Sequence, residues 1–360
     1  MQTQLFTPYK IGSIELSSRI VMAPLTRCRA INKNTPNLLM AEYYGQRSSA
    51  GLIIAEGTSP SVNGLGYRNI PGLFTKDHAE TWRLSTDEVR KNNGHIFIQL
   101  MHTGRIGHQN NLPEGAKVIG PSAIAQSGEI STYDFEKQPY PTPIEMSNED
   151  IEAAIKEFVY SSKLAIEAGF HGVEIHCAHG YLPNQFINKA SNQRKDNYGG
   201  SIENRCRFVL DILKQTCKEI GSDKVGIRIS PFSYADENEK DEDVLGSYNY
   251  LVEQMNTLNL AYLHLSHMGE PHPKKFKLFK SIRTLYSGTL IKCGDYTKET
   301  AEEAIQNNEC DMIAFGRDYI ANPDLVERFK NNWPLAERDN SLWYGDGAEG
   351  YTDYPFYKTI

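Results

Sequence analysis

Residues 172–181 read Gly-Val-Glu-Ile-His-Cys-Ala-His-Gly-Tyr, and this stretch decides how the rest of the chain is interpreted. Its apolar, β-branched beginning, Gly172–Ile175, predicts a buried strand that ends where a helix is due to begin. His176, His179 and Tyr181 lie at that junction. Imidazoles are hydrogen-bond donors with a tunable charge, and a phenol is a weak acid. The stretch therefore suits a substrate that develops negative charge on oxygen and then takes up a proton.

The same residues have two other interpretations. A histidine at the end of a strand often has only a structural role. His176 and His179 are also spaced like half of a zinc site, but a catalytic zinc usually needs three protein ligands. Glu174 is a candidate third ligand, although it lies inside the strand, where alternation does not obviously bring it to the same ion. These residues alone leave a structural role and a zinc-dependent hydrolase open.

The composition is that of a globular protein. The chain has 360 residues, of which 39% are hydrophobic and 23% charged, with a formal net charge of −7. The acidic balance argues against nucleic-acid binding, and no apolar run is long enough for a membrane span. Met1–Phe6 lacks the basic and apolar regions of a signal peptide, and six scattered cysteines without a CxxC pair suit a reducing compartment. We therefore expect a cytoplasmic protein without nucleic-acid or membrane partners.

Short apolar runs rich in β-branched residues recur along the chain, mostly separated by helix-like segments. They are Ile20–Ala23, Leu52–Ala55, Ile96–Leu100, Gly172–Ile175, Val225–Ile229, Tyr262–Leu265, Thr289–Ile291 and Met312–Phe315. Continuous apolar strands that alternate with helices predict parallel strands buried on both faces. Eight such units predict a single α/β domain over residues 1–360, built as a (β/α)8 TIM barrel. A doubly wound sheet is the structural alternative.

Three segments are expected outside the minimal barrel. Phe6–Leu16 predicts an N-terminal hairpin with Gly12 in its turn. The stretch 105–143, after the third barrel strand, is long and weakly periodic, which is typical of a lid or a substrate loop. The C-terminal tail 340–360 carries six aromatic residues, too many for a disordered segment, so we expect it to pack on the barrel.

In a TIM barrel, the polar residues that follow the strands face one common site. Here they include an amide, a guanidinium and several small residues, which can line a flat, hydrogen-bonding heterocycle. The loops after strands seven and eight are the common phosphate site of the fold, and there backbone N–H groups and a bidentate cation can hold phosphate. These two loops hold Gly294, Asp295, Gly316 and Arg317. The other strand-end residues are Pro24, Leu25, Thr26, Ala55, Gln99, His176, His179, Tyr181 and Arg228.

The segment Gly345–Gly350 matches the GxGxxG pattern of dinucleotide-binding folds. It follows no predicted strand, and too few residues remain after it for a βαβ unit. We therefore do not interpret this segment as a nucleotide site.

Longer motifs give the chain a resemblance to a known family. They are Met22–Arg27, Ala50–Glu56, His176–Tyr181, Asn192–Arg194, Tyr198–Arg205, Ala314–Arg317, Ala321–Leu325 and Gly350–Pro355. Together the motifs are highly specific and span nearly the whole chain. On these motifs the chain resembles the old yellow enzyme family of FMN-dependent ene-reductases. Its ending and its two-histidine motif resemble those of the bacterial N-ethylmaleimide and nitrate-ester reductases in particular.

The resemblance implies a cofactor and a place for it. FMN would lie across the barrel mouth, with its phosphate held by the loops after strands seven and eight. Arg228 would lie near N1 and stabilise the anionic reduced flavin, where its charge is needed. The residues around the flavin ring would be Pro24, Leu25, Thr26, Ala55 and Gln99, and those around the phosphate Gly294, Asp295, Gly316 and Arg317.

The resemblance also implies catalytic roles. His176 and His179 would hydrogen-bond the carbonyl oxygen of the substrate, and Tyr181 would protonate Cα after the flavin N5 delivers hydride to Cβ. Tyr67 and Tyr351 would line the substrate space. NADPH would reduce the flavin first and then leave, in a ping-pong cycle, and no metal is implied.

The expected partner is a small electrophilic alkene, and the chain would act as a monomer or homodimer. A flavin-binding protein without turnover is an alternative of another class, but such a store needs neither the histidine pair nor the phenol. Met101, Asp295 and Asp346 depart from the family pattern. They leave open whether enones, maleimides, nitro compounds or nitrate esters are preferred.

Overall fold

Eight parallel strands close into a barrel in a computed structural model that describes residues 3–134, 136–233, 240–267 and 272–358. The strand order around the barrel is β10-β11-β12-β13-β14-β3-β4-β5. Its closure confirms the predicted (β/α)8 barrel over the doubly wound sheet, and every predicted strand overlaps an observed one. The barrel strands are β3 (Ile20–Met22), β4 (Leu52–Thr58), β5 (Ile96–Leu100), β10 (Gly172–Cys177), β11 (Val225–Ile229), β12 (Tyr262–Ser266), β13 (Leu290–Cys293) and β14 (Met312–Phe315).

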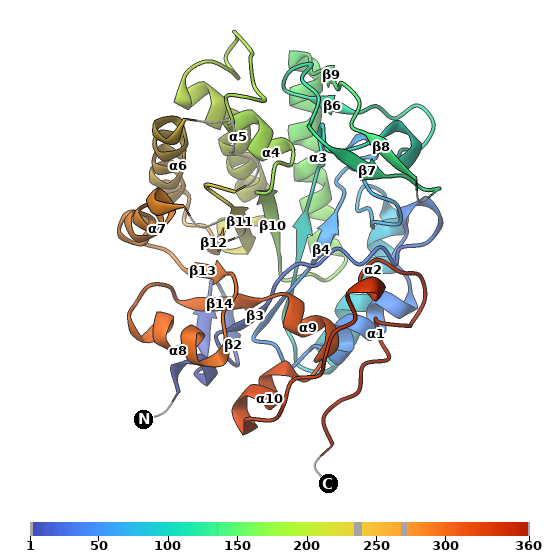
Figure 1. Ribbon diagram of the computed structural model, residues 1–360, viewed down its shortest axis with the longest axis vertical. Helices are drawn as coiled ribbons and strands as arrows, with labels where there is room; N and C mark the ends of the chain where they lie inside the picture. Colours follow the sequence, from blue (N-terminus) through green and yellow to red (C-terminus); the bar gives the residue numbers. More distant parts are fainter. Residues whose placement is uncertain (1–2, 135, 234–239, 268–271, 359–360) are drawn as a thin grey trace.

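Helices surround the barrel strands (Figure 1). The longest, α3, begins with a capping box in which Ser147 accepts a hydrogen bond from the Asp150 N–H and the Asp150 carboxylate accepts one from the Ser147 N–H. None of the helices in the described ranges has both the length and the apolar composition needed to cross a membrane. The α-helices are α1 (Leu38–Gln46), α2 (Lys76–Lys91), α3 (Asn148–Glu167), α4 (Leu182–Ile187), α5 (Ile202–Ile220), α6 (Asp241–Met255), α7 (Pro273–Leu285), α8 (Lys298–Gln306), α9 (Arg317–Ala321) and α10 (Leu325–Asn331). Short 3-10 turns are η1 (Gln4–Phe6), η2 (Asn32–Asn34), η3 (Val62–Gly64), η4 (Gln109–Asn111), η5 (Ser222–Lys224), η7 (Asn256–Leu258) and η8 (Asn340–Leu342).

The predicted N-terminal hairpin closes one end of the barrel. Strands β1 (Tyr9–Ile11) and β2 (Ile14–Leu16) pair antiparallel, and Gly12 turns the chain between them with φ +54°. Ile11 and Leu16 are fully buried and pack against side chains from the beginnings of the barrel strands. Those inward-facing partners include Val21, Leu52, Phe97 and Tyr262. The opposite end, where the strands finish, is therefore the one that can open to solvent.

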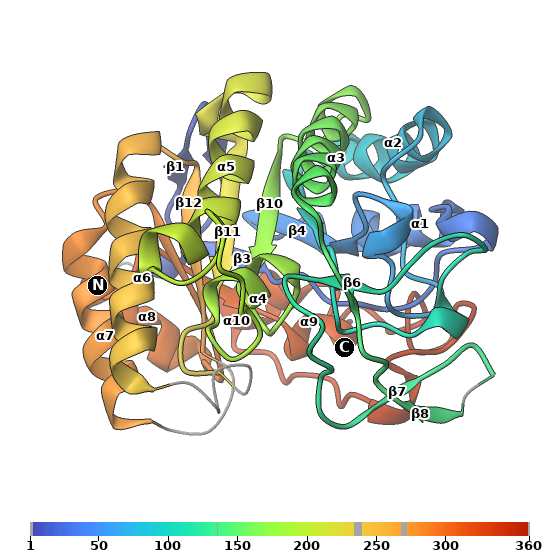
Figure 2. The same cartoon turned by 90° about the horizontal axis from the view of Figure 1, so that it is seen from above.

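The long connection after β5 folds into small sheets of its own. Strands β6 (Ile119–Gly120) and β9 (Ile144–Glu145) pair parallel, and β7 (Glu129–Ser131) and β8 (Lys137–Pro139) form an antiparallel hairpin. Figure 2 shows the insert, α4 and the C-terminal tail on the side of the barrel toward which the β10 arrow points. The insert predicted for residues 105–143 thus lies at the carboxyl ends of the barrel strands, which is where a lid over the site would have to be.

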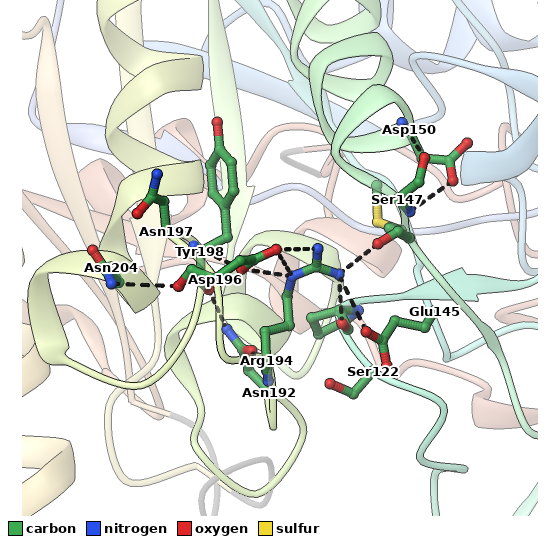
Figure 3. A network of polar contacts seen from close by, with 12 residues as sticks. Ser122, Glu145, Ser147, Asp150, Asn192, Arg194, Asp196, Asn197, Tyr198 and Asn204 are labelled. Atoms are coloured by element: carbon green, nitrogen blue, oxygen red, sulfur yellow. Dashed lines mark hydrogen bonds and ion pairs between the residues drawn. The ribbon is translucent and has the colours of Figure 1, made fainter.

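One arginine anchors the base of this insert to the barrel (Figure 3). Arg194 is buried and donates hydrogen bonds to the carbonyl oxygens of Pro121, directly after β6, and Met146, directly after β9. The Asp196 carboxylate holds the guanidinium with contacts of 3.1 Å and 2.5 Å. Ser122 strengthens the junction by accepting a hydrogen bond from the Gln193 N–H at 3.0 Å. Strands β6 and β9 are therefore fixed in place even though each has only two residues.

The aromatic tail packs against α1 and other segments around the barrel. Tyr351 is fully buried and stacks on Tyr43 of α1, with ring centroids 4.0 Å apart and an interplanar angle of 7°. Farther along, the Tyr357 ring stacks on Trp333 at 4.7 Å. Such pairs hold the tail through buried aromatic area rather than through secondary structure.

Candidate active site

The ends of the barrel strands open into a cavity of about 590 Å³. Its size is in the range usual for cofactor and ligand sites. Most of the residues predicted from strand ends line it together. They are Pro24, Leu25, Thr26, Gln99, His176, His179, Tyr181, Arg228, Gly294, Asp295, Gly316 and Arg317.

Three predicted residues lie elsewhere. Ala55 is fully buried in the apolar layer between the barrel and its helices, because residues alternate along β4 and Ala55 falls on the outer face. Tyr351 stacks on Tyr43 and does not line the cavity. Tyr67 packs beside Met101 and Tyr181, both of which line the cavity, and its hydroxyl oxygen lies 3.1 Å from that of Tyr181. Ala55, Tyr67 and Tyr351 are thus the predicted site residues that are not among those lining the cavity.

Other cavity residues were not predicted as site residues. Trp343 and Tyr344 of the tail form part of the wall, and so do Tyr296 and Phe315 from the ends of the last two strands. The number of aromatic residues in the tail predicted that it packs on the barrel. It did not predict which of these rings face the site. Met101, noted only as a departure from the family pattern, also lines the cavity.

The two histidines and the tyrosine meet because the chain turns sharply after β10. His179 adopts φ +57° and Gly180 φ +80°, both in the left-handed region. This turn brings the His179 ring to 5.4 Å from the His176 ring, measured between centroids, and Tyr181 to 4.8 Å from His176. The His179 Nε2 shares a hydrogen bond with Ser266 Oγ at 2.9 Å. Two imidazoles and a phenol therefore face one small volume.

Both imidazoles are held neutral. Burial lowers the pKa of His176, and the neighbouring His179 and the Arg228 charge lower it further. Burial and the Arg228 charge likewise lower the pKa of His179 well below its usual range. A neutral imidazole still donates one N–H, so the pair can bind a negatively charged oxygen without acting as the acid. Of the three side chains, only the Tyr181 phenol could then serve as an acid.

A buried charge network forms the floor beneath the cavity. The Glu174 carboxylate accepts hydrogen bonds from Gln99 Nε2 at 2.7 Å and contacts His264 Nδ1 at 2.8 Å. Glu174 and His264 are both fully buried. Burial opposes both charges, but mutual attraction still lowers the pKa of Glu174 and raises that of His264. The Glu174 carboxylate holds the amide nitrogen of Gln99, so the side-chain carbonyl oxygen of Gln99 is left to accept a hydrogen bond from a ligand in the cavity.

Arg228 occupies the middle of this floor. Its Nη2 lies 3.3 Å from Ser266 Oγ and 3.5 Å from Cys293 Sγ. Burial alone would raise the pKa of the Cys293 thiol, but the Arg228 and His264 charges lower it. The guanidinium thus presents a buried positive charge at the cavity.

The structure gives the zinc interpretation no ligand set. Glu174, its candidate third ligand, is engaged by Gln99 and His264 instead of facing His176 and His179. Within the described ranges, no three His, Cys, Asp or Glu side chains converge in a way that could hold a metal ion.

The residues present fit a flavin. Among the described residues, neither Arg228 Nε nor His176 Nδ1 finds a hydrogen-bond partner, although both atoms are buried. Both residues line the cavity, so a polar molecule bound there would supply the partners that these atoms lack. A cavity with an amide carbonyl, a guanidinium and apolar walls suits a flat heterocycle that has both donors and acceptors.

The far end of the cavity fits a phosphate group. Gly294 and Gly316 line it, so their backbones can approach a ligand closely. Arg317 is half-exposed there, and its Nη1 lies 3.9 Å from Asp295 Oδ1. The Asp295 side chain is 99% exposed, so solvent screens its charge. An acid beside the phosphate loop is tolerated for this reason.

Buried arginines hold the tail that forms one wall. The Arg27 guanidinium donates to the carbonyl oxygens of Trp343 at 3.0 Å and Gly350 at 2.6 Å. Arg29 donates to a whole series of carbonyl oxygens, those of Arg27, Leu342, Trp343, Gly347 and Glu349. The position of Trp343 and Tyr344 at the cavity therefore depends on contacts to the backbone of the tail.

A buried carboxylate lies close to these arginines. Glu56, at the end of β4, accepts hydrogen bonds from the Arg27 N–H at 3.2 Å and the Tyr44 hydroxyl at 3.1 Å. Burial raises the pKa of Glu56 to about 7, although both hydrogen bonds lower it. The protonation of this group can therefore change near neutral pH.

Comparison with known sequences agrees with this site. The profile of the NADH:flavin oxidoreductase / NADH oxidase family matches residues 4–336. The putative 12-oxophytodienoate reductase 11 of Oryza sativa subsp. japonica is 38% identical over 360 residues, which cover 98% of this chain and 97% of that protein. The probable flavin mononucleotide-dependent alkene reductase of Leishmania infantum is 38% identical over 357 residues, with coverages of 98% and 97%.

Solved structures are similar over the same extent. Morphinone reductase in complex with tetrahydroNAD superposes with a TM-score of 0.92 at 39% identity, covering 98% of both chains. The old yellow enzyme homologue from Zymomonas mobilis superposes with a TM-score of 0.93 at 36% identity, covering 98% of this chain and 99% of the other. The chain therefore belongs to the NADH:flavin oxidoreductase / NADH oxidase family and is a flavin-dependent oxidoreductase of the old yellow enzyme type.

Proposed function

We propose that this protein reduces carbon–carbon double bonds conjugated to an electron-withdrawing group, with FMN as its cofactor and NADPH as its reductant. The observation that carries the proposal is the convergence of His176, His179 and Tyr181 with the Arg228 guanidinium in one cavity. The similarity to a probable alkene reductase over nearly the whole chain supports the same substrate class.

Residues of the floor and the last two loops would hold the cofactor. When bound, FMN would supply the hydride that adds to the alkene. Gln99 would offer its carbonyl oxygen to a donor on the ring, and Arg228 would balance negative charge that gathers on the ring. Gly294, Gly316 and Arg317 would bind the phosphate.

The two imidazoles would bind the substrate by its oxygen. When hydride adds to an enone, negative charge moves onto the carbonyl oxygen. His176 and His179 are neutral and buried, so each can offer one N–H to that oxygen without losing its proton. Donors fixed in advance in this way stabilise the developing charge, and losing one typically costs about 10²–10³ in rate.

Tyr181 would complete the reaction as a general acid. Its ring lies beside His176, so a substrate oxygen held by the imidazoles brings the neighbouring carbons toward the phenol. The hydroxyl can then give its proton to Cα, while the enolate collapses to the ketone. General acids that are positioned in this way contribute roughly 10²–10⁴ in rate.

NADPH would use the same cavity before the alkene does. Support comes from morphinone reductase, whose structure contains tetrahydroNAD and which superposes on this chain almost completely. We extend the proposal to a single-domain cytoplasmic protein that acts as a monomer or homodimer on small molecules. Comparing NADPH with NADH as reductant, and measuring mass by light scattering, would test these points.

The first test is the visible absorption spectrum of the purified protein, before and after anaerobic addition of NADPH. We expect flavin bands that bleach with NADPH and return when an enone is added. A protein that stays colourless after incubation with FMN would disprove the proposal. Flavin bands that do not bleach with NADPH, or that bleach and then do not return with any activated alkene, would favour a flavin store.

The second test separates the acid from the rest of the site. Replacing Tyr181 with Phe removes the proton and keeps the ring. We expect alkene reduction to slow by about 10²-fold or more, and flavin reduction by NADPH to change little. Equal losses in both half-reactions would contradict the role of Tyr181 as proton donor.

A further inference from the structure

The loop that follows β4 brings a second phenol to the acid. The Tyr67 hydroxyl oxygen lies 3.1 Å from the Tyr181 hydroxyl oxygen. The two rings are nearly perpendicular, at 88°, with centroids 6.4 Å apart. The rings therefore meet at an edge, and the two hydroxyl groups are the atoms that come within hydrogen-bonding distance.

The Tyr67 loop is fixed on both sides of this contact. The Gly66 carbonyl oxygen accepts a hydrogen bond from Asn111 Nδ2 of the insert at 3.0 Å. Arg68 Nη2 donates to the Tyr344 carbonyl oxygen of the tail at 2.8 Å, and Asn69 Nδ2 donates to Asp346 Oδ1 at 3.2 Å. The loop is thus tied to the insert on one side and to the tail on the other, which holds the Tyr67 hydroxyl in place.

Proton transfer from Tyr181 creates a charge that needs a partner. In the proposed reaction the Tyr181 O–H bond breaks, and a C–H bond forms with the electron pair of the enolate. Negative charge then leaves the oxygen held by His176 and His179 and appears on the Tyr181 oxygen. The resulting phenolate recovers a proton from solvent before the next turnover.

We infer that Tyr67 is a positioning residue for this step and that its hydroxyl donates a hydrogen bond to the Tyr181 oxygen as the proton departs. A hydrogen bond to a charged acceptor is stronger than one to a neutral acceptor, so this contact strengthens as the phenolate forms. Interactions that are stronger in the transition state than in the ground state raise the rate. The inference rests on the proposed role of Tyr181 and adds a residue that acts through it.

A residue that only shapes the cavity would behave differently. Such a residue would affect every substrate, and its effect would not depend on the Tyr181 hydroxyl. A residue that supports the phenolate matters only when Tyr181 gives up its proton. A double-mutant cycle separates these two cases.

The experiment uses the FMN-loaded full-length protein, reduced by NADPH and then mixed with an enone in a stopped-flow instrument. We expect Tyr67→Phe to slow flavin reoxidation by about tenfold or more. In the Tyr181→Phe background, adding Tyr67→Phe should change the rate by less than about twofold. A quinone, whose reduction needs no protonated carbon, should reoxidise wild type and Tyr67→Phe at similar rates.

Tyr133→Phe is the matched control. The Tyr133 hydroxyl contacts the side chain of Asn69, two residues from Tyr67, at 3.3 Å, so this variant disturbs the same loop without touching Tyr181. We expect it to reoxidise at the wild-type rate. A loss equal to that of Tyr67→Phe would assign the effect to loop geometry and overturn the inference.

The remaining outcomes are also decisive. If Tyr67→Phe slows the enone and the quinone equally, or slows the Tyr181→Phe protein as much as the wild type, Tyr67 is only a wall residue. If Tyr181→Phe itself reacts at the wild-type rate, the proposed acid is wrong. If Tyr181→Phe slows flavin reoxidation by the enone and Tyr67→Phe does not, the role of Tyr181 as the acid is supported and the inference about Tyr67 is wrong.

Discussion

The floor and the rim of the cavity are built by different physical means. Floor residues Gln99, Glu174, Arg228, His264 and Cys293 come from five successive barrel strands, β5, β10, β11, β12 and β13, and contact one another through side chains. The rim consists of the insert 105–143 and the tail 340–360, which are held instead by side chains that bind backbone carbonyl oxygens. Arg29, for example, donates to the carbonyl oxygens of Leu342, Trp343 and Glu349 in the tail.

This difference shows which part of the site tolerates change. A side chain of the floor is fixed by the identity of its neighbours, so one substitution leaves a buried charge without a partner. A contact to a backbone carbonyl survives when the residue that carries the carbonyl is replaced. The tail and the insert can therefore vary in sequence around a constant floor, so we expect substrate choice to depend on the rim and the proposed cofactor chemistry to depend on the floor.

The largest effect is expected when the buried pair of Glu174 and His264 in the floor is disrupted. Glu174→Ala leaves His264 and Gln99 without their buried acceptor. Removing one partner of a buried ion pair typically costs about 3–5 kcal/mol, and we expect a loss of that size in the free energy of unfolding, measured in urea. Glu174→Gln, which keeps the volume, should lose less. A cost of about 1 kcal/mol or less for Glu174→Ala would show that the floor is no more rigid than the rim.

A second test uses pH at the boundary between floor and rim. Burial raises the folded-state pKa of Glu56 to about 7, above its usual value of 4.5, so the folded protein binds more protons than the unfolded chain between these values. Its contribution to stability is complete below about pH 4.5 and is lost as the pH rises through about 7. The loss is on the order of 3 kcal/mol.

Glu56→Gln carries no titrating group and provides the comparison for this pH effect. Relative to the wild type, we expect the variant to gain stability on going from pH 5 to pH 8 in urea unfolding experiments. If the difference between wild type and Glu56→Gln stays constant over this range, the carboxylate does not titrate there and is paired more firmly than its burial indicates.

A third test loosens the rim alone. Arg29→Met removes the donors that bind the tail carbonyls, and each carbonyl that stays buried without a partner costs about 1–3 kcal/mol. We expect faster amide hydrogen exchange in residues 342–350, with little change in β11 or β12. Ranking of alkene substrates should shift because Trp343 and Tyr344 line the cavity. Faster exchange throughout the barrel would mean that the tail also supports the floor.

The smallest expected effect provides the baseline. Lys330 and Glu327 form an ion pair of 3.0 Å on α10, and both side chains are nearly half exposed. Exposed pairs contribute little, so Glu327→Ala should change the free energy of unfolding by no more than about 0.5 kcal/mol. A cost approaching that of Glu174→Ala would remove the contrast between buried and exposed pairs in this protein.

Sequence predicted most of the barrel and the cavity because both follow from local patterns. Apolar runs located the strands, and strand ends located Gln99, Arg228 and the two histidines. The contact between Glu174 and His264 could not be predicted, because the two residues lie 90 positions apart in the sequence and meet only when the barrel closes. Ala55 was misplaced because a strand end does not state which face a residue takes. Tyr351 was misplaced because the tail has no periodicity, and buried arginines decide which of its rings faces the site.

The N-terminal hairpin has a consequence for the order of events. With Ile11 and Leu16 filling the lower end of the barrel, molecules reach the cavity from the other end, where the strands finish. In the proposed cycle, the reductant and the alkene would share that one entrance, and the product of each would leave before the next molecule enters. We therefore expect an excess of either substrate to slow the reaction with the other.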